Sequence, residues 1–141
     1  MFKPSAEKSE ATRQLVASIF ANRVPNGSKY TVAYAYYMKS GLFGKKVFNY
    51  VIGFSAEDQE IVIIPTDSDG NSSEAVLLQR SHIASAKRGL QGDTKIKTTD
   101  GATYQFVVPP YTPAALEAAY ILPVVQEDEA TRFMAFIKQS F

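Results

Sequence analysis

The order of predicted elements constrains this chain more than any other feature of its sequence. Between residues 29 and 108, short blocks rich in β-branched and aromatic residues alternate with turn signals, which predicts antiparallel strands joined mostly as hairpins. The expected strands are residues 30–38, 47–55, 60–66, 75–78, 83–87, 94–98 and 103–108. Residues 128–141 then predict one amphipathic helix, so the chain is expected to be mainly β within the α+β class. The apolar stripe of this helix consists of Ala130, Phe133, Met134, Ile137 and Phe141.

Two further segments precede and interrupt this pattern. Residues 5–24 predict an N-terminal helix with a narrow apolar stripe. The stripe consists of Leu15, Val16, Ile19 and Phe20. Residues 109–125 form an insert that begins with a proline-rich run, in which Thr112 is expected to cap a short helix. The sequence shows no repeat or linker, so residues 1–141 are expected to form a single domain.

Three stretches of the chain are similar to a known group of proteins. The sequence YVIGF at residues 50–54 is followed by EIVIIP at residues 60–65, and a closing run occupies residues 126–137. These stretches resemble bacterial members of the pleckstrin-homology-like superfamily. The resemblance implies a bent antiparallel seven-stranded sheet or barrel, capped by the C-terminal helix. The extra N-terminal helix, the insert and the lack of tryptophan distinguish the chain from eukaryotic members.

The best candidate for a ligand site is a basic segment between the first two predicted strands. Lys39, Lys45 and Lys46 lie in an expected loop, residues 39–46, together with Phe43. The equivalent loop of eukaryotic relatives binds inositol phosphates, so the resemblance implies that these four residues could bind a phosphate or an anionic headgroup. No arginine follows the lysine pair, so the lysines would act as point charges. The alternative is a solvated glycine turn with Phe43 folded back onto the core.

Few residues suit catalysis or metal binding. The chain has no cysteine, which excludes thiol catalysis, disulfides and thiolate–metal sites. His82 is the single histidine, and we expect it to be exposed or structural; as a general base it would need a partner such as Asp58 or Asp93. The acidic residues of 67–74 lack the spacing of a helix-loop-helix calcium site. We therefore expect no catalytic residue, no metal site and no cofactor.

The composition gives little support for nucleic acid or for a membrane span. A net charge of +1 supplies no global attraction for nucleic acid, and strand alternation is expected to bury one face of the tyrosines at residues 30–37 that could stack bases. No segment has the length and apolar character of a signal peptide or of a membrane span. Together with the lack of cysteine, this predicts a cytoplasmic location.

These observations leave three functional classes open. The first is a non-enzymatic module that binds a protein or peptide, in a groove between an edge strand and the closing helix. The second is a peripheral membrane module that uses the basic loop to bind anionic phospholipid headgroups. The third is a small α+β barrel enzyme that uses His82. The stripe of the N-terminal helix is expected to pack on its own sheet or on a second copy, as a homodimer.

Overall fold

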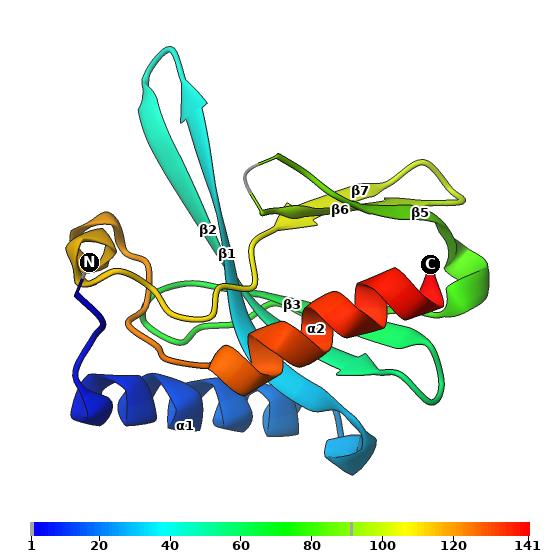
Figure 1. Cartoon of the computed structure of the whole chain (residues 1–141), viewed down its shortest axis with the longest axis horizontal. Helices are drawn as coiled ribbons and strands as arrows, with labels where there is room; N and C mark the ends of the chain where they lie inside the picture. The colour runs from blue at the N-terminus through cyan, green and yellow to red at the C-terminus, as the bar shows by residue number, and fades with distance from the viewer. Residues whose placement is uncertain (1, 91) are drawn as a thin grey trace.

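The chain has an α+β architecture, in which two α-helices pack with two antiparallel sheets (Figure 1). The computed structural model describes residues 2–90 and 92–141, and within them all seven predicted strands are present. The first sheet has the order β1-β2-β3-β4, and the second has the order β5-β6-β7. The first contains β1 (Thr31–Gly41), β2 (Gly44–Ser55), β3 (Glu60–Thr66) and β4 (Val76–Leu78). The second contains β5 (Ile83–Arg88), β6 (Thr94–Thr98) and β7 (Thr103–Phe106).

Both predicted helices are present, and local chemistry explains where they begin. Helix α1 spans Ala6–Arg23, and the Ser5 hydroxyl caps its first turn by accepting a hydrogen bond from the Lys8 amide at 3.2 Å. Helix α2 spans Glu127–Ser140 and begins with three acidic residues, which complement the positive end of the helix dipole. Neither of these described helices combines the length and apolar character that crossing a bilayer requires.

The four-stranded sheet is buried on both faces. On one face, Ile52 packs towards α2 and the inner face of the three-stranded sheet, where the Phe106 and Phe133 rings lie 5.9 Å apart. On the other face, Tyr34 packs towards α1, and Phe20 belongs to the same buried cluster. Tyr34 and the alanines of β1 point to opposite faces, so the predicted alternation is confirmed.

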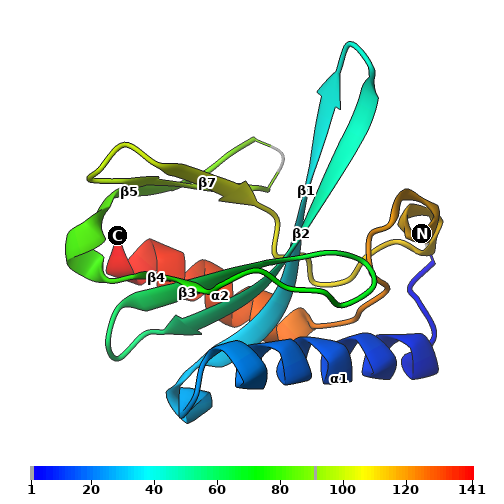
Figure 2. The same ribbon diagram turned by 180° about the vertical axis from the view of Figure 1, so that it is seen from behind.

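The apolar stripe of α1 packs on the sheet of its own chain. Val16, Ile19 and Phe20 are buried there, and Figure 2 shows α1 lying along the sheet. The outward surface of the helix is polar and exposed, with Glu10 and Arg13 among its residues. A homodimer through this helix would have to use that polar surface, and it stays a prediction.

The two sheets meet at one antiparallel bridge among the described residues. It joins Tyr36 of β1 to Val107 through backbone hydrogen bonds of 3.0 and 2.7 Å. Beside it, the side chain of Gln126 takes the place of a strand: its Oε1 accepts from the Tyr34 amide at 2.9 Å, and its Nε2 donates to the Tyr34 carbonyl at 2.8 Å. The same Nε2 donates to the Pro109 carbonyl at 2.9 Å. The expected single seven-stranded sheet is therefore two sheets, and within the described part of the chain no barrel closes, because a side chain replaces further strand pairing.

Hydrogen bonds between a side chain and the backbone stabilise the insert, residues 109–125. Thr112 Oγ1 donates to the Leu122 carbonyl and accepts from the Val124 amide, each at 2.9 Å. A short 3-10 helix, η3 (Ala114–Ala119), begins after Pro113, and no side chain caps it. The cap predicted for Thr112 is therefore wrong, because its hydroxyl joins the two arms of the insert.

Candidate functional site

The basic segment lies on a projecting β-hairpin rather than in a loop. β1 and β2 stay paired up to Gly41 and Gly44, so only Leu42 and Phe43 form the turn. Gly44 has a φ of +108°, a left-handed backbone conformation that favours glycine. The loop predicted for residues 39–46 is therefore wrong, because each residue on either side of the turn has a cross-strand partner. Both views show the hairpin standing clear of the remaining chain (Figures 1 and 2).

The tip of the hairpin is apolar and its sides are basic. Leu42 and Phe43 are fully exposed, so Phe43 does not fold back onto the core. Lys39 on β1 lies opposite Lys46 on β2, and Lys45 immediately precedes Lys46. In the part of the chain that the structure describes, none of these lysines makes an ion pair. The hairpin thus brings together all four residues of the predicted site, while their anionic ligand stays a prediction.

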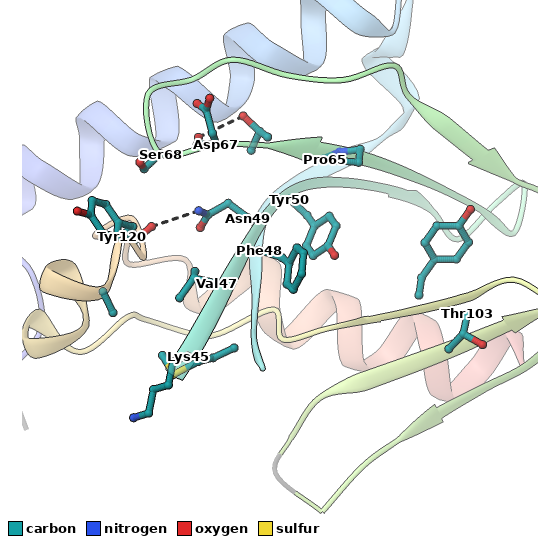
Figure 3. Close-up of a pocket in the computed structure, with 14 residues that line it drawn as sticks. Lys45, Val47, Phe48, Asn49, Tyr50, Pro65, Asp67, Ser68, Thr103 and Tyr120 are labelled. Carbon is teal, nitrogen blue, oxygen red and sulfur yellow. Dashed lines mark hydrogen bonds between the residues drawn. The ribbon is translucent and has the colours of Figure 1, made fainter. Parts of the chain in front are cut away.

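Beside the hairpin, the four-stranded sheet is notched. β3 pairs with β2 only from Asn49 to Ser55, so residues 44–48 of β2 have no strand partner on that side among the described residues. We call these five residues the bare edge. A cavity of about 740 Å³, which we call the notch, lies beside it (Figure 3). Its lining includes Lys45, Phe48, Thr66, Asp67, Tyr104 and Tyr120.

The notch has walls on both faces of the sheet. On the α1 face, the Tyr120 carbonyl accepts a hydrogen bond from Asn49 Nδ2 at 3.2 Å (Figure 3). Asn49 Oδ1 in turn accepts from the Tyr34 hydroxyl, and burial raises the pKa of that hydroxyl, which keeps it a neutral donor. On the other face, Phe48 of β2 and Tyr104 of β7 line the cavity. Residues from both faces of the sheet therefore line the notch, among them Phe48, Tyr104 and Tyr120.

The loop after β3 closes the notch at one end. The Asp67 carboxylate accepts hydrogen bonds from the Asp69 and Asn71 amides, each at 2.9 Å. Hydrogen bonds from Asn71 hold the pKa of Asp67 below its usual value. The Asp67 carboxylate thus stabilises the turn of its own loop.

A second pair of cavities lies along β5, which is an edge strand of the three-stranded sheet. A cavity of about 720 Å³ lies between β5 and α2, and a smaller one of about 280 Å³ lies along the same strand. Ala86 and Phe141 line both, so we call the two together the β5–α2 groove. Helix α2 contributes Phe133, Met134 and Ile137 to its wall. Met134 was predicted on the buried stripe, but it is 44% exposed, and Phe136 is buried instead.

The charged lining of the β5–α2 groove is cationic. Arg88 and Lys138 line the larger cavity, and Arg80 and Lys87 line the smaller one. The Arg80 guanidinium lies 5.2 Å from the centre of the Phe141 ring. Among the described residues, no aspartate or glutamate lines either cavity. The groove therefore combines apolar walls with a positive rim.

His82 was expected to be exposed or structural, and its side chain is exposed. Its Nδ1 accepts a hydrogen bond at 3.2 Å from a backbone amide of its own turn. The carboxylates considered as its partners bind elsewhere: Asp58 lies 3.0 Å from Lys29 Nζ, and Asp93 accepts from Gln105 Nε2 at 2.6 Å. Within the described chain, no hydrogen bond joins His82 to either carboxylate.

The basic residues line different surfaces of the molecule. Lys45 lines the notch, whereas Arg88 lines the β5–α2 groove. Lys95 and Lys97 lie on the exposed face of β6.

Tyr34 is fully buried, as the alternation predicted, so its ring cannot stack a base.

Apart from Lys45, the residues that line the notch were not predicted from the sequence, and the predicted groove beside the closing helix was not assigned any residues. Tyr104 and Tyr120 come from segments far apart in the chain, and no local pattern links them to the first hairpin. The spacing of Met134 fits the apolar stripe of α2 and gives no sign of its exposure. The one usable signal was the pairing potential of residues 39–46, where two glycines bracket an apolar pair.

No model of a known protein family matches this chain, and no curated protein matches it either. Its function is therefore inferred from its own grooves, strand edges and charges.

Proposed function

We propose that this chain is a non-enzymatic interaction module of pleckstrin-homology-like architecture that binds an extended peptide in the β5–α2 groove. One observation carries the proposal: two cavities that share lining residues lie along an edge strand, and the larger of them is also lined by an amphipathic helix. An edge strand presents unpaired backbone groups, and an extended peptide binds them by adding to the sheet as a further strand.

The chemistry of the groove defines the expected peptide. Side chains of an added strand alternate between two faces, so one of them would enter the larger cavity against Phe133, Met134 and Ile137. A large aliphatic or aromatic side chain suits this position, since its full burial is worth about 1.5–3 kcal/mol. Arg88 and Lys138 favour acidic residues beside it, because complementary charge directs association.

Peptide selection tests this proposal directly. A displayed library of random linear peptides, selected on the wild-type protein, should yield ligands with an apolar residue flanked by acidic ones. Their affinity, measured by titration calorimetry, should fall about tenfold or more for Met134→Lys, because an ammonium group then replaces an apolar wall of the cavity.

The matched control lies on another part of the same helix. Gln139→Lys adds the same charge to α2 but lines a different hollow, and it should bind peptides as the wild type does. Recovery of no peptide, or of peptides that bind Met134→Lys as tightly as the wild type, would contradict the proposal.

A second candidate function, docking on an anionic bilayer, is favoured by the exposed tip of the hairpin. Two exposed apolar side chains beside three lysines suit the membrane interface, where each lysine is worth about 1 kcal/mol near anionic lipid. Pelleting with phosphatidylserine vesicles should then decrease for Phe43→Ser and for Lys45→Glu with Lys46→Glu. Equal pelleting of these variants and the wild type, or no pelleting at all, would exclude this candidate.

A further inference from the structure

The bare edge is a second strand edge on this molecule, separate from β5. β2 pairs with β1 from Gly44 to Phe54 but with β3 only from Asn49 onwards, which leaves residues 44–48 open on one side. At about 3.3 Å per residue, these residues expose roughly 17 Å of backbone. Unpaired backbone groups over this length are enough to align an extended segment.

The notch provides room for such a segment. Its cavity lies where β3 would continue if it were as long as β2, next to Thr66 at the end of β3. Phe48 and Tyr104 line the notch on one face of the sheet, and Ala119 and Tyr120 of the insert line it on the other, so alternate side chains of an added strand would contact the two linings. An added strand would therefore bind through its backbone to β2 and through its side chains to aromatic walls.

The charge of the hairpin selects the chemistry of the segment. Residues 31–55 contain three lysines and no acidic residue. Lys45 and Lys46 lie on the bare edge itself, and Lys39 is the cross-strand neighbour of Lys46. A segment that carries glutamate or aspartate beside the hairpin would meet these three charges. Asp67, which also lines the notch, has its carboxylate hydrogen-bonded within its own loop.

Lysines on an exposed edge have another known use, which is to prevent strands of two molecules from pairing. That use accounts for the charges of the bare edge. It does not account for a cavity with aromatic walls beside it. The two roles differ in outcome, because removal of a protective lysine causes self-association, whereas removal of a binding lysine weakens a partner.

We infer that the bare edge accepts an extended acidic segment of a partner protein, which fills the notch as an added strand. This surface is distinct from the β5–α2 groove, since no residue lines both cavities. The occupant is a peptide segment rather than a bilayer, because a bilayer would contact the tip and leave the notch empty.

Variants sort the selected peptides between the two surfaces. A displayed peptide library selected on the wild type should yield an acidic class whose affinity falls about tenfold or more for Lys45→Glu with Lys46→Glu. The control, Lys95→Glu with Lys97→Glu, makes the same change of charge on the exposed face of β6 and should leave this class unaffected. Met134→Lys should leave it unaffected as well.

Hydrogen exchange tests the binding mode on the unmodified protein. Bound acidic peptide should slow exchange of amides within residues 44–48, and methylation of alternate peptide nitrogens should abolish binding, because an added strand needs those donors. Protection confined to residues 83–88 would place the peptide on β5 instead.

Several outcomes would overturn the inference. If every selected peptide depends on Met134, the proposed function stands and this inference fails; if every one depends on Lys45 and Lys46, the reverse holds. If the variant Lys45→Ser with Lys46→Ser self-associates and no selected peptide depends on these lysines, the lysines serve to prevent strand pairing between molecules. If the glutamate variants change only vesicle pelleting, the lysines serve a bilayer.

Discussion

At the scale of single residues, the hydroxyl of Tyr34 joins three parts of the fold. It donates to Asn49 Oδ1 and accepts from the Leu122 amide at 3.0 Å, in a position with no exposed surface. Tyr34→Phe would leave both partners unpaired, and an unpaired buried group costs about 1–3 kcal/mol. We expect the free energy of unfolding, measured by urea titration, to fall by about 2 kcal/mol or more.

The control for this prediction is Tyr36→Phe, on the same strand and the same face. Tyr36 is only half-buried, and within the described chain its hydroxyl makes no hydrogen bond. Loss of the Tyr36 hydroxyl should change the free energy of unfolding by less than about 0.5 kcal/mol. Equal losses for the two variants would show that the hydroxyl of Tyr34 stabilises the fold no more than that of Tyr36.

Glu60 makes the stability of the protein depend on pH. The Tyr30 hydroxyl donates to its carboxylate at 2.6 Å and Lys29 Nζ lies 3.1 Å away, and these partners lower the pKa of Glu60. A carboxyl with a lowered native pKa stabilises the fold above its unfolded pKa of about 4.3, and this stabilisation is lost as pH falls through the native value. The free energy of unfolding should therefore decline as the pH falls below about 5, and more gently in Glu60→Gln.

Part of this decline should remain in the variant. Asp67 and Asp100 also have lowered pKa values, so their contributions are lost in the same direction. Tyr30→Phe should reduce the slope as well, because the hydrogen bond from Tyr30 is the largest cause of the lowered pKa of Glu60. Parallel pH curves for the wild type and Glu60→Gln would refute the assignment.

At the scale of elements, a glycine allows α1 to dock on the sheet. A Cβ at Gly53 of β2 would overlap the ring of Phe20. Gly53→Ala should therefore lower the free energy of unfolding by about 1–3 kcal/mol, as expected for overpacking. Gly41→Ala is the control, because its nearest new contact is a backbone oxygen at 3.8 Å.

A second substitution checks the cause. Phe20→Leu makes space for the new methyl group, so it should cost less in the Gly53→Ala background than alone. Additive losses, read from thermal unfolding by circular dichroism, would show that the two residues do not conflict.

Elements with a strong local pattern were predictable from the sequence. The ends of both helices lie within one residue of their predicted positions, because a capping serine, a following proline and three clustered acids mark them. The length of the first hairpin was not predictable from composition. Lysines and glycines at residues 39–46 have the composition of a loop, yet a glycine on each side of Leu42 and Phe43 allows a tight turn.

Contacts between distant segments were also beyond the reach of local patterns. Gln126 binds the backbone of Tyr34, and Ser9 accepts from the Val125 amide at 2.8 Å, but neither side chain belongs to an apolar stripe. The notch arises from unequal strand lengths and from Tyr120 of the insert. A candidate site that depends on such contacts becomes visible only in three dimensions.

At the scale of the whole molecule, the net charge of +1 conceals an uneven distribution. Residues 31–55 carry three cations and no acid, residues 83–106 carry four cations and two acids, and the rest carries eight cations and twelve acids. The first segment forms the β1–β2 hairpin, whose tip lies at the top of Figure 1, and the second forms the three-stranded sheet in the upper part of the same view. We therefore expect retention on heparin–agarose at low salt in spite of the small net charge.

Paired variants test the distribution rather than the total. Lys45→Glu with Lys46→Glu should elute at lower salt than Lys3→Glu with Lys8→Glu, although both change the net charge equally. The latter pair lies in the acidic part of the molecule, where Lys3 pairs with Glu127 and Lys8 with Glu117. Equal elution would show that net charge alone governs retention.

The amide of Gln126 has a consequence for how the molecule would report occupancy of its groove. This residue immediately precedes α2, and it holds both backbone groups of Tyr34 in the core of the sheet. Helix α2 therefore cannot tilt away from the sheet at its first turn without exposing the Tyr34 amide to water. Hydrogen exchange of the Tyr34 amide should therefore distinguish a ligand that enters a rigid groove from one that displaces α2 from the sheet.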